Sequence, residues 1–201
     1  MFRQLFRPLF GSRRARAVRV CCAAVLRVRE DDRIVLVESA SRPGAFAPPG
    51  GVLRCSEPLG QLGFAGDNDH HLRGYLPTRS IEAFVRWFES GTGREDGEEC
   101  LRRALAGVLA EFGVPGQNLS FDRLGGEIEC SAVELRGFEF YDLAPGPARD
   151  RLLALAADPR VHTVFSASSA QVAAGRVGTA VIAPHARYLT CDNTVVAKNS
   201  R

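Results

Sequence analysis

A proline–glycine bend and a downstream helix hold the residues whose types and spacing could do chemistry. The bend, residues 45–51 with the sequence Ala-Phe-Ala-Pro-Pro-Gly-Gly, cannot be helical because two prolines precede two glycines. Gly50 and Gly51 would let the backbone approach a phosphate group closely. The helix, expected over residues 98–112, has Glu111 near its end. The Glu111 carboxylate is a hard oxygen ligand of the kind that Mg²⁺ prefers.

A polar insertion, residues 55–79, follows the bend. Its Asp69, His70 and His71 could bind a metal, although such a stretch is also common in a solvated loop. Arg73 could clamp a phosphate, since a guanidinium group matches it bidentately, or it could be an ordinary exposed loop arginine.

An aromatic helix is expected next, over residues 80–90, with Ser80 as its N-cap. Its apolar face repeats at helical spacing through Ile81, Phe84, Val85 and Phe88. Trp87 and Phe88 could stack on a base, and one of the two rings is expected in the core.

These segments resemble the Nudix family, and within it the SMODS-associated Nudix domain. The bend, the aromatic segment 84–89, Gly93-Arg94-Glu95 and the closing Gly113-Val114 pair carry the resemblance. It extends over roughly residues 18–190 and places the chain in a branch found in bacterial nucleotide-second-messenger conflict systems. It implies an α/β class, a Nudix-like α/β/α sandwich with a mixed sheet in a single domain, and a Mg²⁺-dependent diphosphate chemistry.

The chain departs from the Nudix pattern in the helix itself. Family members carry Arg-Glu-x-x-Glu-Glu before a closing Gly–apolar pair. With Gly113-Val114 as that pair, the motif falls on residues 106–111, Ala-Gly-Val-Leu-Ala-Glu, and only Glu111 survives. A register that begins at Arg103 fills the three carboxylate positions with Ala104, Gly107 and Val108. One carboxylate at most cannot assemble the usual Mg²⁺ cluster, since Mg²⁺ requires several hard oxygen ligands or a phosphate already held in place.

Acids at the start of the helix offer a weak substitute. They are Glu95, Asp96, Glu98 and Glu99. Acids in a first turn commonly complement the helix dipole. Twelve residues span about 18 Å of helix at about 1.5 Å each, so Glu99 cannot share one ion with Glu111.

The remaining pattern predicts a mixed α/β domain. Strands are expected over residues 18–28, 33–38, 127–135, 137–143 and 162–166, and further helices over residues 147–157 and 184–189. The first two strands would form a hairpin around Glu30-Asp31-Asp32, and residues 41–44 and 55–79 would be irregular. We expect residues 1–17 to be an N-terminal arm, residues 18–190 the domain with its insertion at about 55–95, and residues 191–201 a tail.

The net charge of +3 is concentrated in the arm. Residues 1–20 contain six arginines and no acid, which leaves a body near −3 and no case for binding double-stranded nucleic acid. Phe2, Leu5, Phe6 and Leu9 recur at helical spacing, so residues 2–10 could be a basic amphipathic helix in peripheral membrane contact, or a helix docked on its own domain.

The six cysteines form no CxxC pair, so free thiols and a cytoplasmic location are expected, without a structural zinc site. No apolar run is long enough to span a membrane.

The sequence therefore favours a Nudix-fold protein that binds or senses a nucleotide in a bacterial cyclic-nucleotide-based antiphage system, with impaired hydrolysis and a defence-system protein as a further partner. Phe46, Gly50, Gly51, Asp69, Arg73 and Trp87 would bind the ligand, and Glu111 would be the remaining catalytic and metal residue. One alternative is an active Mg²⁺-dependent Nudix hydrolase of a nucleoside-diphosphate-linked substrate. Another is a non-catalytic interaction protein that docks through the arm.

Overall fold

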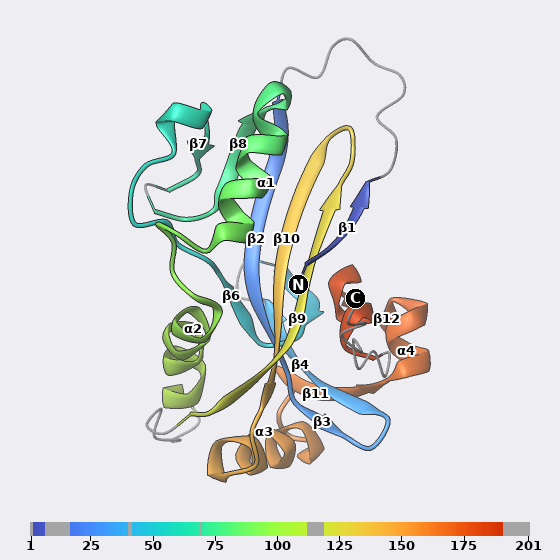
Figure 1. Cartoon of the computed structure of the whole chain (residues 1–201). Helices are drawn as coiled ribbons and strands as arrows, with labels where there is room; N and C mark the ends of the chain where they lie inside the picture. Colours follow the sequence, from blue (N-terminus) through green and yellow to red (C-terminus); the bar gives the residue numbers. More distant parts are fainter. Residues whose placement is uncertain (1, 7–16, 40–41, 69, 112–118, 191–201) are drawn as a thin grey trace, which may run out of the picture. The chain divides into compact units, whose positions relative to one another are not determined.

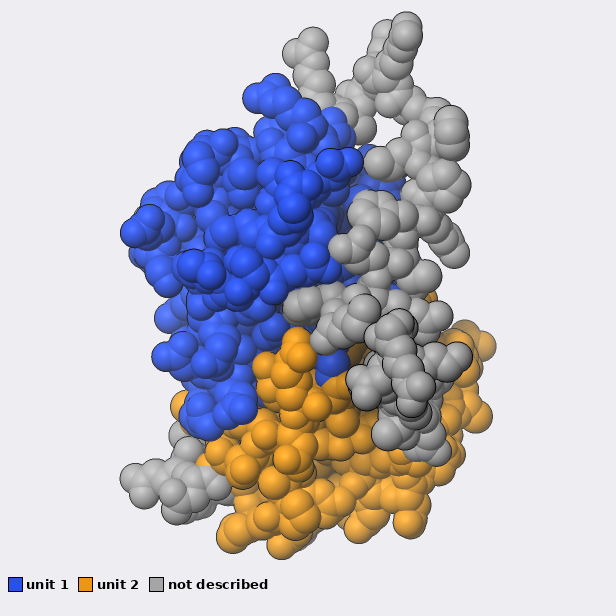
Figure 2. Space-filling view, viewed as in Figure 1, with its two compact units in different colours: residues 1–24, 50–104, 125–139 blue, residues 25–49, 105–124, 140–201 orange. Residues whose placement is uncertain are grey.

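The computed structural model describes residues 2–6, 17–39, 42–68, 70–111 and 119–190, with residues 2–6 and 108–111 described by their backbone alone (Figure 1). The chain divides into two compact units, coloured separately in Figure 2. Unit 1 comprises residues 1–24, 50–104 and 125–139, and unit 2 comprises residues 25–49, 105–124 and 140–201. Both units are mixtures of strands and helices, so the predicted α/β class is confirmed.

Strands β2 (Ala17–Arg27), β9 (Phe121–Cys130) and β10 (Glu134–Leu143) contribute residues to both units. They belong to a sheet with the order β1-β9-β10-β2-β8-β7, in which β6 pairs with β2. The other strands of this sheet are β1 (Phe2–Phe6), β6 (Gly50–Val52), β7 (Ala65–Gly66) and β8 (Arg73–Pro77). The β1–β9 pair is parallel and the β2–β8 pair antiparallel, so the sheet is mixed as predicted.

The sequence of β2 explains its central place in that sheet. Val18, Val20, Cys22 and Ala24 alternate with more exposed residues and are fully buried. Because side chains in a strand alternate between faces, one face of β2 faces the core along this part of the strand. Residues 24–26 are then buried in succession, as expected where both faces of a strand are covered.

Helix α1 (Ile81–Ser90) packs its predicted face inward in unit 1. Ile81, Phe84, Val85 and Phe88 are all buried, and the helix ends at Gly91 in the left-handed conformation at φ 72°. Gly137 of β10 makes room for this helix, because an added Cβ there would lie 2.9 Å from the Phe88 ring. The two short 3-10 helices of this unit are η1 (Gly60–Leu62) and η2 (Thr78–Ser80).

Unit 2 contains a second mixed sheet with the order β11-β4-β5-β13-β12, in which β3 pairs with β4. Its strands are β3 (Arg29–Glu30), β4 (Arg33–Ser39), β5 (Arg42–Ala47), β11 (Val164–Ser168), β12 (Arg176–Val177) and β13 (Ala180–Ile182). Its helices are α3 (Pro147–Ala157), α4 (Ser169–Ala174) and the 3-10 helix η3 (Pro184–Leu189). Helix α2 (Gly97–Glu111) begins in unit 1 and ends in unit 2.

Several predicted elements require correction. Residues 2–6 form a strand that pairs with β9, so the basic amphipathic helix predicted there is wrong for these residues, and residues 7–10 lie outside the described part. The hairpin around Asp31 joins β4 to the short β3, whereas β2 belongs to the other sheet. Residues 42–44 begin β5, although a loop was expected.

Among the described residues, no helix is long and apolar enough to cross a membrane. Free thiols are confirmed at the five cysteines within the described ranges.

Candidate functional site

The close approach of Gly51 to helix α2 defines the candidate site in unit 1. A Cβ added to Gly51 would lie 2.8 Å from Cβ of Ala104 and 3.3 Å from Sγ of Cys100. The Cys100 thiol also donates to the Gly51 carbonyl oxygen at 3.3 Å. Glycine is therefore required at position 51 because strand β6 lies directly on one face of the helix.

The face of α2 that meets β6 carries no carboxylate in its first two turns. Cys100 and Ala104 are one turn apart on this face, and helical spacing continues the same row through Gly107 to Glu111. Burial raises the pKa of Cys100 to about 12, so this side chain remains a thiol at neutral pH. The row therefore presents a thiol, a methyl group and a glycine before it reaches Glu111.

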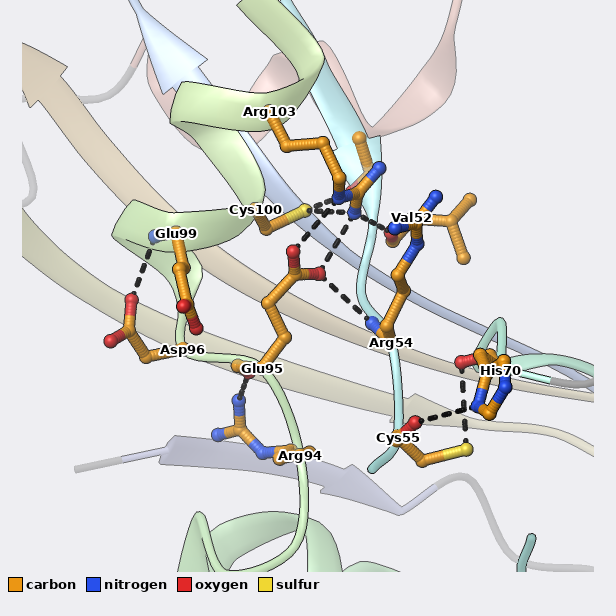
Figure 3. A network of polar contacts seen from close by, with 11 residues as sticks. Val52, Arg54, Cys55, His70, Arg94, Glu95, Asp96, Glu99, Cys100 and Arg103 are labelled. Atoms are coloured by element: carbon orange, nitrogen blue, oxygen red, sulfur yellow. Dashed lines mark hydrogen bonds and ion pairs between the residues drawn. The ribbon is translucent and has the colours of Figure 1, made fainter. Parts of the chain in front are cut away.

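The nearby acid Glu95 is held by Arg103 (Figure 3). Nε and Nη2 of Arg103 donate to the two carboxylate oxygens of Glu95, each at 2.8 Å. The Arg54 backbone N–H donates to Glu95 Oε2 at 3.1 Å, and the Glu95 N–H donates to the Arg54 carbonyl oxygen at 2.8 Å. Burial by itself would raise the pKa of Glu95, but the bonds and charge of Arg103 outweigh burial, and the pKa is lowered. Glu95 is thus an ionised partner of Arg103.

A buried ion pair fixes the segment that carries Glu95. Arg94 Nη2 donates to Glu139 Oε1 at 2.8 Å, and both side chains are only 5% exposed. The Arg94 guanidinium lies 4.5 Å from the centre of the Phe88 ring and donates to the carbonyl oxygens of Phe88 and Glu95. These contacts join β10, the end of α1 and the start of α2, so they position Glu95 next to Arg103.

Arg54, His71, Arg73 and Arg103 form a group that we call the basic cluster. Arg54 and His71 are paired by an isolated antiparallel bridge, and Arg73 follows two residues later on β8. Burial lowers the pKa of His71, and the positive charges of Arg54 and Arg103 lower it further. His71 is consequently neutral at pH 7, and the charge of the cluster comes from its arginines.

The donor set does not fit a divalent metal. Among the side chains that the structure describes, those of residues 17–39, 42–68, 70–107 and 119–190, no three His, Cys, Asp or Glu are grouped so that they could hold an ion. Glu111 lies at the end of α2, but its side chain is outside the described part, and Asp69 lies outside it altogether. Mg²⁺ needs several oxygen ligands, which the described face of α2 does not supply.

The other residues predicted to bind a ligand occupy varied places. Gly50 is exposed at the start of β6, and Arg73 is exposed on β8, where its Nε lies 3.3 Å from Asp67. Trp87 is half-buried on α1, beside Phe84 at 5.5 Å between ring centres. Phe46 belongs to unit 2, where it is only 6% exposed and packs on Phe165, which leaves little ring surface for a ligand.

Sequence reasoning did not identify Arg54 as a site residue. The sequence did contain a hint, because Arg54 follows the bend by three positions and alternates with the buried Leu53 and Cys55. The sequence presents Arg103 only as the start of a motif register, and Glu95 as part of the segment that carries the resemblance and as an acid at the start of the helix. Their pairing follows from the fold, not from their spacing.

Unit 2 contains a separate cavity of about 520 Å³. Its lining includes Arg27 and Asp142, which form a two-point ion pair at 2.6 and 2.5 Å. Arg149 donates to the Arg29 carbonyl oxygen at 2.5 Å in the same lining. Arginine and aspartate are equally represented around this cavity, so its charge favours no one class of ligand.

Comparison with known proteins gives one family. A model of the SMODS-associated NUDIX domain matches residues 17–190. Neither the curated proteins nor the solved structures contain a match to the chain. The matched range includes the bend, the insertion, both helices of the candidate site and the whole basic cluster.

Proposed function

This chain belongs to the SMODS-associated NUDIX domain family, and from that premise we propose that it binds a nucleotide-derived ligand without hydrolysing it. The family match confirms the resemblance predicted from the bend, the insertion and the helix. The two mixed sheets with their helices agree with a Nudix-like α/β fold. A nucleotide-related function follows from the family, whereas the loss of hydrolysis is our proposal.

One observation carries the proposal: the described side chains of the α2 face against β6 include none of the carboxylates that Nudix chemistry requires. Cys100 and Ala104 lie against β6, Gly107 continues their row along the helix, and Glu95 is bound to Arg103 through both oxygens. A metal that activates water needs oxygen ligands fixed around it. We therefore assign no catalytic step to this helix.

Binding a nucleotide does not require a catalytic metal, and residues of unit 1 offer groups that suit its phosphate and its base. Exposed backbone at Gly50, together with the bend, suits a phosphate group, and the half-buried Trp87 ring suits a base. Arg73 adds positive charge beside the bridge of Arg54 and His71. We propose Gly50, Gly51, Arg73 and Trp87 as ligand-binding residues.

The family description supports a cellular setting for the ligand. The family is named for its association with SMODS systems, so we propose that the ligand is a nucleotide or nucleotide-derived signal of a bacterial cyclic-nucleotide-based antiphage system. A protein of the same system would be the partner that responds to the bound state.

The test measures turnover and binding side by side on the full chain. Nucleoside diphosphates, nucleoside-diphosphate sugars and cyclic dinucleotides and trinucleotides are incubated with the protein in Mg²⁺ or Mn²⁺, and the same compounds are screened by thermal shift. We expect stabilisation by at least one compound, as ligand binding to the native state raises its melting temperature, and no product. Mg²⁺-dependent turnover that Glu111→Gln abolishes would establish the hydrolase instead.

A further inference from the structure

The arginines of the basic cluster could bind a diphosphate without a metal ion. This inference rests on the proposed function. A diphosphate carries several negative charges that a Nudix enzyme offsets with Mg²⁺. The described α2 side chains against β6 are those of Cys100 and Ala104, neither of which supplies an oxygen ligand for that ion. Any offsetting charge at this face must therefore come from protein side chains.

Arg103 stands on this helix with part of its guanidinium available. Its Nε and Nη2 are committed to Glu95, and Nη2 also donates to the Val52 carbonyl oxygen at 2.9 Å. No described residue accepts a hydrogen bond from Nη1, and the side chain is 31% exposed. Glu95 thus fixes the orientation of the guanidinium while two N–H groups remain for a ligand.

Arg54 supplies a second guanidinium, which forms no ion pair with a described acid. Two hydrogen bonds to Glu95 hold the Arg54 backbone. The Arg54 N–H donates to the Glu95 carboxylate, and the Arg54 carbonyl oxygen accepts from the Glu95 N–H. The Arg54 side chain is exposed, and no described residue accepts a hydrogen bond from its guanidinium. Figure 3 shows the Arg54 side chain extending from this anchored backbone toward the end of the network where Val52 lies.

Both arginines act on one place in the fold. The positive charge of each lowers the pKa of His71, and the charge of Arg73 lowers it as well. Asp67 lies 3.3 Å from Arg73 and Glu95 is bonded to Arg103, whereas the Arg54 guanidinium forms no ion pair with an acid in the described part, although its charge helps to lower the pKa of Glu95. An anion that enters here would meet an excess of positive charge.

We propose that Arg54 and Arg103 bind the diphosphate group of the ligand directly and take the place of the divalent metal. A guanidinium forms two parallel charge-assisted hydrogen bonds with phosphate oxygens, a geometry that an ammonium group does not reproduce. Ligand binding is consequently independent of Mg²⁺. Arg103 is the preoriented donor, and Arg54 provides a guanidinium that no described acid holds in an ion pair.

The test is isothermal titration of the full chain with inorganic pyrophosphate, in EDTA and in MgCl₂. We expect binding in EDTA that Arg54→Gln weakens about 10- to 100-fold, which is the loss of charge-assisted hydrogen bonds. Arg54→Lys should recover only part of the affinity, because it restores charge without the planar fork. Arg86→Gln is the matched control, since Arg86 is 72% exposed on α1 and pairs with Glu82.

Three outcomes would overturn the inference: pyrophosphate binding that requires Mg²⁺, equal binding by Arg54→Gln and the unchanged chain, or no pyrophosphate binding in either buffer. Each is distinct from failure of the proposed function. If the nucleotide screen still detects binding without turnover, the proposed function stands and only the role of Arg54 and Arg103 is lost.

Discussion

Substitution Gly51→Ala should destabilise the protein by about 1–3 kcal/mol, the usual cost of forcing extra volume into a packed site. The added Cβ would lie 2.8 Å from Cβ of Ala104, whereas ordinary contact begins at 3.4 Å, so β6 and α2 would have to separate by 0.6 Å. The Ala104 methyl group cannot move away by changing rotamer, because its position is set by the helix backbone. The Cys100 thiol, 3.3 Å from the new atom, adds a second close contact.

The measurement is the free energy of unfolding from urea titration, compared with that of Gly60→Ala. Gly60 is an exposed glycine whose added Cβ would meet no atom within 4 Å, so it reports the general effect of losing glycine. Adding Ala104→Gly to Gly51→Ala should recover stability relative to the sum of the two single changes, by about 0.5–3 kcal/mol of coupling. Equal stability of Gly51→Ala and Gly60→Ala would refute the contact between the bend and the helix.

Three further changes test other parts of the site. Glu139→Gln should lower the free energy of unfolding by about 3–5 kcal/mol, because the buried Arg94 charge loses its anion. A free energy of unfolding, measured by chemical denaturation, within about 1 kcal/mol of that of the unchanged chain would contradict this. The pKa of Glu95 is lowered by folding, so the ionised carboxylate stabilises the fold fully above its ordinary value of 4.5 and loses that effect as pH falls through the lowered pKa. The gap in melting temperature between the unchanged chain and Glu95→Gln should therefore narrow below pH 4.5, and a constant gap would argue against the Arg103 pairing. Gly107→Ala should raise stability by about 1 kcal/mol, since it removes a mid-helix glycine whose added Cβ meets no described atom within 4 Å, and a lower melting temperature would show that glycine is needed there.

Local periodicity predicted the helices well because the residues of a helix's apolar face lie only three or four positions apart in the sequence. α3 was predicted with its observed bounds, and α1 buries the four residues expected of it. Strand β8 was missed because its sequence, Arg-Gly-Tyr-Leu-Pro, contains a glycine and a proline that are typical of loops. It is a strand because it pairs with β2, which no local pattern records. The same reason applies to residues 2–6. Their apolar residues have helical spacing, but the segment is a strand that pairs in parallel with β9.

The site was predictable only in part, for a related reason. The Gly-Gly bend and the loss of carboxylates from α2 are readable from composition and spacing. The link between Glu95 and Arg103 spans eight positions and includes the backbone of Arg54, which is 41 residues from Glu95. These groups meet only after β6 packs on the helix, so the basic cluster could not be inferred from the chain alone.

The central claim is that this Nudix-family domain binds its ligand and leaves it intact. The most direct test incubates the full chain with a compound that the thermal-shift screen identifies, in excess Mg²⁺, then denatures the protein and quantifies the released compound by liquid chromatography and mass spectrometry. We expect all of the compound to be recovered unchanged over hours, at the same level as in a reaction with Glu111→Gln. Conversion to a nucleoside monophosphate by the unchanged chain, with intact recovery from Glu111→Gln, would contradict it.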